Sequence, residues 1–433
     1  MQRGCRAWPA RDRTELPGLP VGDCAGLFGR GRTGDCAGVR PERADRAAAE
    51  HAGVADASRP AALASLPSLA VSASVRTWAR GRGKADVTTA VSTDAARARR
   101  LDETRRQLSD YIGKSGLQAL VLGASKDPNA KVTTVLVSAQ TGRPVLVAKA
   151  PLTAVAERSV EAEARLLQEL GMLGLNRRFE AIPNVVELVE FEGRTALVMT
   201  AVPGTPMTTS YFAWRHTRDP ARVAADFTAA GEWLAALQAA TAQAPTTVDL
   251  DGGVEALLAG RFSEDQELEA DLDRLAELNG RLSADAVPRT LAHGDFWPGN
   301  LLLENGRVTG VVDWEAGSTS GEPLRDLVRF GLAYALYLDR TTRAGRAVAG
   351  HPGLVAGTWG AGVAYAIDGT GWFPELFRTF LQRGLERLGA SAERWRDAAL
   401  AGVAEVAALA DDEAFARRHL DLFRRLSRPE GLR

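Results

Sequence analysis

The sequence predicts an α+β protein with two lobes: a small, mostly antiparallel β-sheet with one inserted helix, then a larger, mainly helical lobe. Short runs rich in β-branched residues and separated by turn residues fill residues 117–200. Helical periodicity dominates from residue 221 onwards. Between them, "VPGTP" at 202–206 has the Pro and Gly content of a connector. We therefore expect a small lobe, a hinge and a helical lobe, with boundaries at 101–201, 202–207 and 208–433.

The first hundred residues have a different composition. Residues 1–100 are rich in Arg, Ala, Gly, Pro and Asp and show no clear periodicity, so we expect a disordered leader, with a start assigned too early as the alternative. All three cysteines (Cys5, Cys24 and Cys36) lie there, and without a nearby pair of histidines they are a weak metal signal. The rest of the chain has no cysteine, which suits a reducing cytoplasm.

The net charge is close to zero but unevenly distributed. Residues 1–100 hold 17 basic and 10 acidic residues, which leaves 36 basic and 44 acidic residues in the remainder. An acidic body argues against nucleic acid as the main ligand and suits a cationic or neutral small substrate. The most apolar early segment, 61–75, is too short to span a membrane, so we expect no membrane partner. The oligomeric state stays open.

The elements follow in order along the chain. An amphipathic helix is predicted over 101–113. Five strands and one helix follow it, and Glu192-Gly193 joins the last two strands; the strands cover 117–123, 131–139, 144–150, 185–191 and 194–200, and the helix covers 155–171. Helices are then predicted over 221–243, 253–282, 324–339, 374–389 and, with breaks, 391–426. An irregular segment with hairpin signals interrupts them at 291–315.

Lys149 is the last of only five lysines in a chain that otherwise uses Arg. The period of two places Val145, Val147 and Lys149 on one face of their strand, and that face is otherwise apolar. A Lys there is costly unless its ammonium group is paired or reaches a ligand. The lysine is therefore a candidate functional residue.

The following helix offers a partner for it. Val160, Glu163, Leu167 and Leu170 form one helical stripe, so Glu163 points towards the buried face. An ion pair between Lys149 and Glu163 would satisfy both groups. A purely structural salt bridge, or a Lys149 side chain that extends out to solvent, is the alternative.

The segment 291–315 carries the strongest signal. Asn305-Gly306 predicts a two-residue hairpin turn that pairs Leu302 with Thr309 and Asn300 with Val311. Asp313 then shares a face with Asn300, and Asp295 lies in the loop just before. Two carboxylates and an amide oxygen suit Mg²⁺, and Mg²⁺ suggests phosphate chemistry. As an alternative, Asp295 and Asn300 form turns and Asp313 caps the next segment.

"HGDFWPGN" followed by "VVDWE" resembles the aminoglycoside phosphotransferase family, whose relatives include choline kinases and the protein kinase fold. The resemblance covers about residues 105–345. It implies a protein-kinase-like fold, ATP and Mg²⁺ as cofactors, and transfer of the γ-phosphoryl group to a hydroxyl of a small molecule. An aminoglycoside, a sugar, an amino sugar or an amino alcohol could be the acceptor.

The resemblance also implies roles for particular residues. Asp295 would be the catalytic base. Asn300 and Asp313 would bind Mg²⁺, and Glu315 would assist from the outer shell. Lys149, oriented by Glu163, would hold the α- and β-phosphates. Elsewhere His293 would brace the catalytic loop, Asp326 would anchor it, Met199 would lie behind the adenine, and the Thr200 carbonyl and the Val202 amide would bond its edge.

The sequence leaves two contacts open, those of the phosphate-covering segment and those that bind the acceptor. The phosphate-covering segment "LGASKDPNAKV" contains only Gly123, so contacts by Ser125, Lys126 or Asn129 are predictions without a motif. Asp411, Asp412, Glu413 and the acidic face at 263–273 could receive an amine of the acceptor, or could be solvated helix surface.

A nucleotide-binding pseudokinase or scaffold is the alternative function, and a protein kinase is disfavoured because no A-P-E segment follows Asp313.

Overall fold

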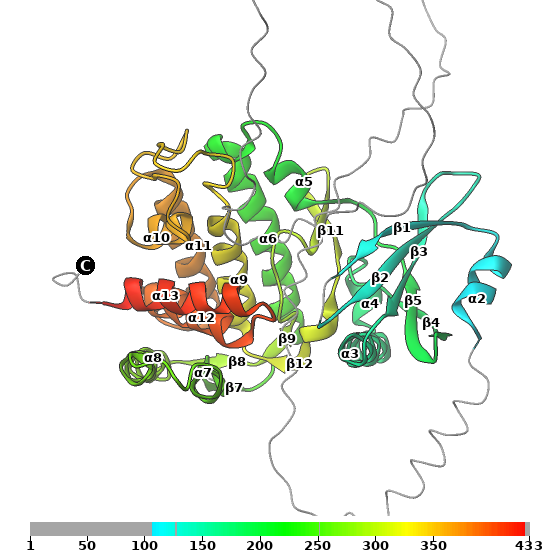
Figure 1. Cartoon of the computed structure of the whole chain (residues 1–433), viewed down its shortest axis with the longest axis horizontal. Helices are drawn as coiled ribbons and strands as arrows, with labels where there is room; N and C mark the ends of the chain where they lie inside the picture. Colours follow the sequence, from blue (N-terminus) through cyan, green and yellow to red (C-terminus); the bar gives the residue numbers. More distant parts are fainter. Residues whose placement is uncertain (1–105, 126–127, 251, 429–433) are drawn as a thin grey trace, which may run out of the picture. The chain divides into compact units, whose positions relative to one another are not determined.

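The computed structural model describes residues 106–125, 128–250 and 252–428, all of which belong to one compact unit (Figure 1). The expected leader at 1–100 and Lys126 lie outside the described residues. Of the helix predicted over 101–113, the described part begins as α2 at Leu108 and continues to Ser115.

The five predicted strands form one antiparallel sheet. They are β1 (Gln118–Ala124), β2 (Lys131–Val137), β3 (Pro144–Pro151), β4 (Val185–Phe191) and β5 (Arg194–Thr200). Their order across the sheet is β1-β2-β3-β5-β4. The inserted helix is α3 (Ala154–Met172), followed by the short α4 (Leu175–Arg178). The expected α+β class with a small antiparallel sheet is confirmed.

The two faces of the sheet pack against different helices. Ala148, Ala196 and Val198 lie on the face covered by α2, where Leu108 completes a small apolar cluster. The alternate residues, which include Leu197 and Met199, face α3 and join the main core. This alternation follows from the period of two along a strand, and it places Lys149 on the α3 side.

Irregular chain and short strands connect the sheet to the helical region. The strand β6 (Thr205–Pro206) pairs with β10 (Leu301–Glu304), which pairs with β11 (Arg307–Val311). A second pair joins β9 (Thr290–Ala292) to β12 (Ser318–Gly321), and a third joins β7 (Pro245–Thr247) to β8 (Ala286–Pro288). The three-stranded β6–β10–β11 sheet and the β9–β12 pair hold the segment 291–315 in place.

The helical region contains α5 (Met207–Tyr211), α6 (Pro220–Thr241), α7 (Val254–Arg261), α8 (Leu268–Leu282), α9 (Pro323–Leu336), α10 (Ala361–Asp368), α11 (Trp372–Leu388), α12 (Trp395–Leu409) and α13 (Glu413–Ser427). The predicted helix 253–282 is wrong as one element, because α7 ends at Arg261. The Asp265 side chain accepts a hydrogen bond from the Glu267 backbone N–H at 2.9 Å, and such local bonds compete with helix continuation. The helix α10 was not predicted.

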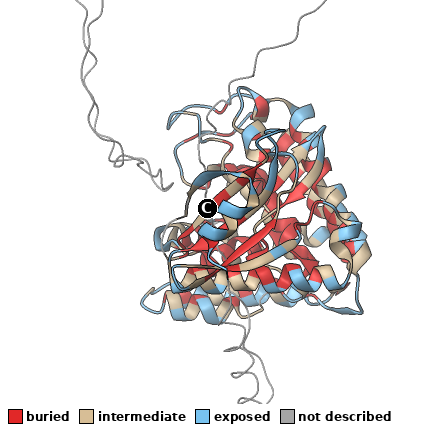
Figure 2. Cartoon of the chain, turned by 90° about the vertical axis from the view of Figure 1, so that its right-hand side faces the viewer, coloured by how far each residue is buried: buried red, intermediate tan, exposed pale blue. Residues whose placement is uncertain are grey.

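The largest apolar cluster runs through the helical region and up to α3, and Figure 2 shows its buried strands and helices inside an exposed outer layer. Its largest fully buried side chains include Trp314, Tyr334 and Phe330. Within the residues that the structure describes, no helix combines the length and hydrophobicity that crossing a bilayer requires.

Candidate active site

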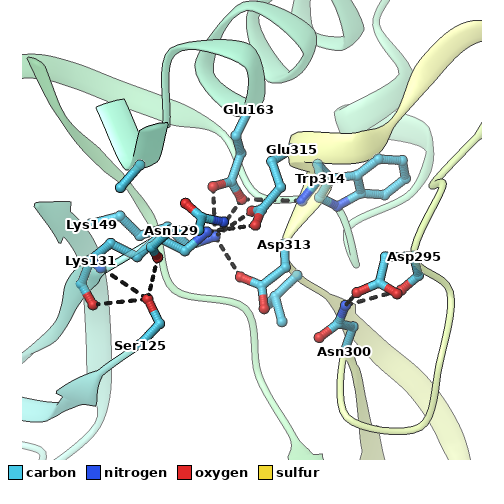
Figure 3. A network of polar contacts seen from close by, with 12 residues as sticks. Ser125, Asn129, Lys131, Lys149, Glu163, Asp295, Asn300, Asp313, Trp314 and Glu315 are labelled. Atoms are coloured by element: carbon cyan, nitrogen blue, oxygen red, sulfur yellow. Dashed lines mark hydrogen bonds and ion pairs between the residues drawn. The ribbon is translucent and has the colours of Figure 1, made fainter. Parts of the chain in front are cut away.

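A buried ion cluster joins the sheet to the hairpin segment (Figure 3). The Lys149 ammonium lies 2.6 Å from both carboxylate oxygens of Glu163 and 2.5 Å from Oδ1 of Asp313. The side chains of Lys149 and Glu163 are 3% and 0% exposed. The predicted Lys149–Glu163 pair is therefore present, and the stripe that places Glu163 inside is fully buried at Val160, Leu167 and Leu170.

A second lysine joins the cluster and was missed by the sequence reasoning. Lys131, at the start of β2, is buried, and its ammonium lies 2.6 Å from Oε1 of Glu315. The other oxygen of Glu315 lies 3.9 Å from the Lys149 ammonium. Two lysines thus face three carboxylates. The one sequence signal for Lys131 was the rarity of lysine in this chain.

The pKa values of the cluster reflect burial and pairing together. Burial alone would lower the pKa of Lys149, but Asp313, Glu163 and Glu315 outweigh it and raise the pKa, so the lysine stays charged. Burial raises the pKa of Glu163, with Lys149 opposing the shift. Burial would also raise the pKa of Asp313, but Lys149 and Lys131 hold it at about 2. Asp313 is thus ionised in the ordinary pH range.

The hairpin that positions Asp313 differs from the predicted register. Glu304 pairs with Arg307 next to the turn, but a bulge follows, so that Leu302 opposes Gly310 and Leu301 opposes Val311. The predicted Leu302–Thr309 and Asn300–Val311 pairs are wrong; the Asn300 carbonyl instead accepts a bond from Val312 N–H at 3.0 Å. A bulge adds one residue to one strand, which the period of two cannot reveal.

Asp313 is also conformationally unusual. It has φ +65° and ψ +61°, in the left-handed region that non-glycine residues rarely adopt. The next residue, Trp314, donates its backbone N–H to Oε1 of Glu163 at 3.2 Å. Its indole N–H bonds the Val311 carbonyl at 2.9 Å. Residues in this region persist where surrounding contacts hold them, often at functional sites.

Asp326 and His293 fasten the loop that carries Asp295. The two carboxylate oxygens of Asp326 accept bonds from the backbone N–H groups of His293 and Gly294, at 2.6 and 2.8 Å. Gly294 has φ +80°, and a Cβ there would lie 2.1 Å from the Ala316 carbonyl oxygen. Asp326 therefore fixes the backbone of the loop at residues 293 and 294. At position 294 the loop accommodates only glycine.

His293 links the loop to the end of the hairpin. Its Nδ1 lies 3.2 Å from the Asp295 backbone N–H, and its Nε2 lies 2.9 Å from the Val312 carbonyl. Nδ1 must then accept and Nε2 must donate, which is a neutral tautomer. Burial lowers the pKa of His293 to about 4, in agreement with that tautomer.

Asp295 is buried and has two side-chain partners. Its Oδ1 accepts bonds from Nε and Nη2 of Arg329 at 3.0 and 2.8 Å, and its Oδ2 accepts one from Nδ2 of Asn300 at 3.2 Å. Figure 3 shows the Asn300 oxygen directed away from Asp295. Burial raises the pKa of Asp295 to about 6, although Arg329 opposes that shift. Arg329 was not predicted, because it lies in a helix 34 residues further on.

The three residues expected near the adenine lie at the end of β5 and just beyond it. Met199, on β5, is buried and lies opposite Val147 of the neighbouring strand β3. The Thr200 backbone N–H donates to Asn184, and its hydroxyl accepts a bond from the Asn184 N–H at 2.9 Å. Val202 packs where a side chain on Gly310 would otherwise stand. Their nucleotide contacts stay predictions.

The loop between β1 and β2 is closed by its own hydrogen bonds. The Ser125 hydroxyl donates to the Asn129 carbonyl at 2.6 Å and accepts from the Lys131 N–H at 2.9 Å. Asn129 is buried, and its side-chain amide has neither donor nor acceptor bonds within the described residues. An unpaired buried amide beside the ion cluster is a candidate ligand contact.

The cluster contains oxygen donors of the kind that Mg²⁺ prefers. Oxygen atoms of Glu163, Asp313 and Glu315 lie within 4.8 Å of one another, and carboxylate oxygens are the preferred ligands of this ion. One oxygen of Glu315 is buried without a hydrogen bond. The predicted ligand Asp313 belongs to this group, whereas Asn300 lies beside Asp295. These residues therefore fit a divalent cation.

An antiparallel sheet with a buried Lys–Glu pair, facing a loop-borne Asp and Asn, combines parts that recur in enzymes of phosphoryl transfer. The family described as "Phosphotransferase enzyme family" matches residues 128–361, which is more than half of the chain. The chain belongs to this family, as the resemblance implied. It is therefore a phosphotransferase enzyme.

Several solved structures match the chain over most of their own length. An apo thermostable mutant of aminoglycoside phosphotransferase APH(4)-Ia shares 17% identity over 73% of this chain and 98% of that one, with a TM-score of 0.45. The choline kinase LicA from Streptococcus pneumoniae shares 13% identity over 74% of this chain and 96% of that one, with a TM-score of 0.44. Macrolide 2'-phosphotransferase MphH from Brachybacterium faecium shares 20% identity over 67% of this chain and 96% of that one, with a TM-score of 0.36. No curated protein sequence matches the chain significantly.

Proposed function

We propose that this phosphotransferase uses ATP and Mg²⁺ and moves the γ-phosphoryl group to a hydroxyl of a small molecule. The observation that carries the proposal is the simultaneous pairing of Lys149 with Glu163 and Asp313, at 2.6 and 2.5 Å. It supports the proposal because Lys149, the proposed phosphate-binding cation, contacts Asp313, the proposed metal-binding carboxylate, at the junction of sheet and hairpin. Two such parts recur in enzymes that transfer phosphoryl groups.

Each residue of the cluster has a distinct task in the proposed reaction. Lys149 holds the α- and β-phosphates, and Glu163 keeps its ammonium in position. Asp313 and Asn300 bind the Mg²⁺, with Glu315 supporting them from further out. Bound Mg²⁺ neutralises negative charge on the phosphates. Asp313, which pairs with Lys149 in this structure, would be one of the residues that hold the ion, and Lys149 would contact the phosphates.

Asp295 acts on the acceptor. Its carboxylate accepts the proton of the acceptor hydroxyl as the oxygen attacks the γ-phosphorus. Burial raises its pKa to about 6, which brings a carboxylate closer to the pKa of an effective base at neutral pH. Arg329 and Asn300 fix its orientation, since they bond to different oxygens of the same group.

The nucleotide base has a proposed place at the end of β5. Met199 lies behind the adenine, and the Thr200 carbonyl and the Val202 amide bond its edge. Ser125 would meet the phosphates from the β1–β2 loop, although its hydroxyl bonds Asn129 in this structure. We propose Asn129 as an additional contact, because its buried amide has no partner among the described residues.

The acceptor class remains an aminoglycoside, sugar, amino sugar or amino alcohol in this proposal, and the location is proposed to be the cytoplasm, without nucleic acid or membrane partners. The second candidate is a nucleotide-binding pseudokinase. The observation that would favour it is the closed ion cluster, in which both lysines are neutralised by carboxylates. A protein kinase is the least favoured reading.

Thermal stabilisation and turnover separate these functions. The melting temperature is measured with ATP alone and with ATP plus Mg²⁺, and ADP release is followed across sugars, amino alcohols and aminoglycosides. An enzyme gives Mg²⁺-dependent stabilisation and acceptor-dependent ADP release. In Asp295→Asn, ADP release should fall by at least roughly 10²-fold while stabilisation by Mg²⁺-ATP persists. Stabilisation without turnover on any acceptor would identify a pseudokinase, and near wild-type turnover in Asp295→Asn would refute the assigned base.

A further inference from the structure

Lys131 is a second buried lysine in the ion cluster, and Figure 3 shows it entering the cluster beside Lys149. Only five of the 53 basic residues of the chain are lysines, and two of them meet here. The Lys131 side chain is 5% exposed, and its ammonium lies 2.6 Å from Oε1 of Glu315. Because a buried ammonium is costly, a second one in the same site needs a physical reason.

The sheet register places the two lysines on one face. Thr133 of β2 lies directly opposite Lys149 of β3, and residues opposite each other share a face. Lys131 comes two residues before Thr133 on the same strand, so its side chain projects to that face as well. Both ammonium groups then reach Glu315, at 2.6 Å from Lys131 and 3.9 Å from Lys149. One carboxylate therefore contacts two cations.

The two ammonium groups differ in the hydrogen-bond donors that they have left. Nζ of Lys149 bonds both oxygens of Glu163 and one of Asp313, which uses its three N–H donors. Nζ of Lys131 makes one hydrogen bond to the described residues, to Glu315. Its other two donors are thus available to an anion, and they lie in a buried site, where a donor without a partner is costly.

The position of Lys131 along the sheet indicates which phosphate it would meet. The proposed adenine contacts lie at the end of β5, where Met199 is opposite Val147 of β3. Lys149 follows two residues further along β3, and Lys131 is opposite Pro151, another two residues along. At about 3.3 Å per residue, the backbone of Lys131 lies about 7 Å further from the base than that of Lys149. Lys131 therefore lies beyond the lysine proposed for the α- and β-phosphates.

The segment before Lys131 supports the same placement. The β1–β2 loop, which would cover the phosphates, ends at Lys131. Within this loop Asn129 is buried, and its side-chain amide has no partner among the described residues. An unpaired amide and an ammonium with spare donors thus lie two residues apart, and both can donate to phosphate oxygens.

The charges of the cluster also favour an anionic ligand. The three carboxylates of Glu163, Asp313 and Glu315 outnumber the two lysines, so the cluster is formally anionic. With a divalent cation held by the carboxylates it becomes formally cationic, which suits a phosphate group. The second lysine provides charge that the carboxylates and the ion would otherwise lack.

We propose that Lys131 is a second phosphate-binding lysine, which donates to the terminal phosphate of ATP while Glu315 keeps its ammonium group in position. The pair repeats, on the neighbouring strand, the arrangement of Lys149 and Glu163. This inference rests on the proposed function and adds a residue that distinguishes ATP from ADP. The competing role for Lys131 is a structural clasp, in which its bond to Glu315 only joins β2 to the hairpin segment.

Nucleotide affinity measures the proposed contact directly. Calorimetric titration of the full chain with Mg²⁺-ATP and with Mg²⁺-ADP, without an acceptor, gives two Kd values for each variant. Lys131→Met should raise the Kd of Mg²⁺-ATP by at least about tenfold and that of Mg²⁺-ADP by less than about threefold. Lys149→Met should raise both, because its proposed partners are the α- and β-phosphates. Lys114→Met removes an exposed lysine of α2 and should change neither.

A second comparison separates the contact from a loss of stability. Lys131→Met leaves the buried Glu315 without its cation, which destabilises the folded protein. The double variant Lys131→Met/Glu315→Gln removes both charges. It is compared with Glu315→Gln alone, so that any effect on the metal is common to both proteins. The double variant should again bind Mg²⁺-ATP more weakly than its reference and Mg²⁺-ADP about as well.

The outcomes distinguish this inference from the proposed function. Equal weakening of both nucleotides in the two comparisons would identify a structural clasp and overturn the inference, and unchanged affinities would overturn it as well. In either case, binding of Mg²⁺-ATP by the wild type together with acceptor-dependent ADP release would leave the proposed function standing. If the wild type does not bind Mg²⁺-ATP, the proposed function fails and this inference fails with it.

Discussion

Replacement of Lys149 by Met removes the cation at the centre of the buried cluster and nearly preserves side-chain length. Glu163 is then left fully buried without its partner, whereas Asp313, with a side chain 35% exposed, can be solvated in part. Breaking a buried ion pair from one side costs about 3–5 kcal/mol, and we assign most of it to Glu163 because water screens the Asp313 contact. At roughly 2 °C per kcal/mol, the melting temperature should fall by about 6–10 °C.

The assay combines denaturation with nucleotide binding. Calorimetry of the wild type, Lys149→Met, Glu163→Gln and the double variant gives the coupling between the two side chains. The double variant should recover much of the lost stability, because it leaves no unpaired charge at 163, yet it should remain unable to turn over ATP. A melting temperature for Lys149→Met within about 2 °C of wild type, or unchanged turnover, would contradict the reasoning.

Three further predictions concern the catalytic loop and the helical region. Gly294→Ala should lower stability by about 1–3 kcal/mol, because the left-handed backbone and the Ala316 carbonyl both oppose a Cβ; an unchanged urea midpoint would contradict this. Asp326→Ala should cost about 1–3 kcal/mol for each N–H left without an acceptor and should lower kcat more than ATP affinity, which steady-state kinetics can resolve. His419 has a folded pKa of about 3 against 6.5 ordinarily, so the unfolded chain binds more protons between these values. The free energy of unfolding should therefore fall as the pH drops below 6.5, by up to about 1.4 kcal/mol per pH unit from this residue, and His419→Gln should show a shallower decline.

The sheet was largely predictable from the sequence. The strands Val185–Phe191 and Arg194–Thr200 have the predicted bounds, because β-branched runs bounded by turn residues are local signals. The Lys149–Glu163 pair was predictable for a similar reason. A strand period of two and a helical stripe each state which face a charged residue occupies, and two buried opposite charges on facing surfaces need each other.

Local signals failed where a single residue changes the register or ends a helix. The bulge between Leu302 and Leu303 shifts the hairpin by one residue, and the Asp265 bond to Glu267 N–H separates α7 from α8. Arg329 and Lys131 were missed because neither lies in a motif. Their importance comes from partners far along the chain, Asp295 and Glu315.

The sequence alone determined the α+β class, the strands of the sheet, the buried Lys149–Glu163 pair and the motif residues of the hairpin segment. Only the tertiary structure decided that Asp313, 164 residues after Lys149, completes the cluster, that Lys131 neutralises Glu315, and that Arg329 orients Asp295. The physical reason is range. Periodicity and turn preference act over a few residues, whereas these contacts depend on how the sheet, the hairpin and α9 pack together, which no local pattern encodes.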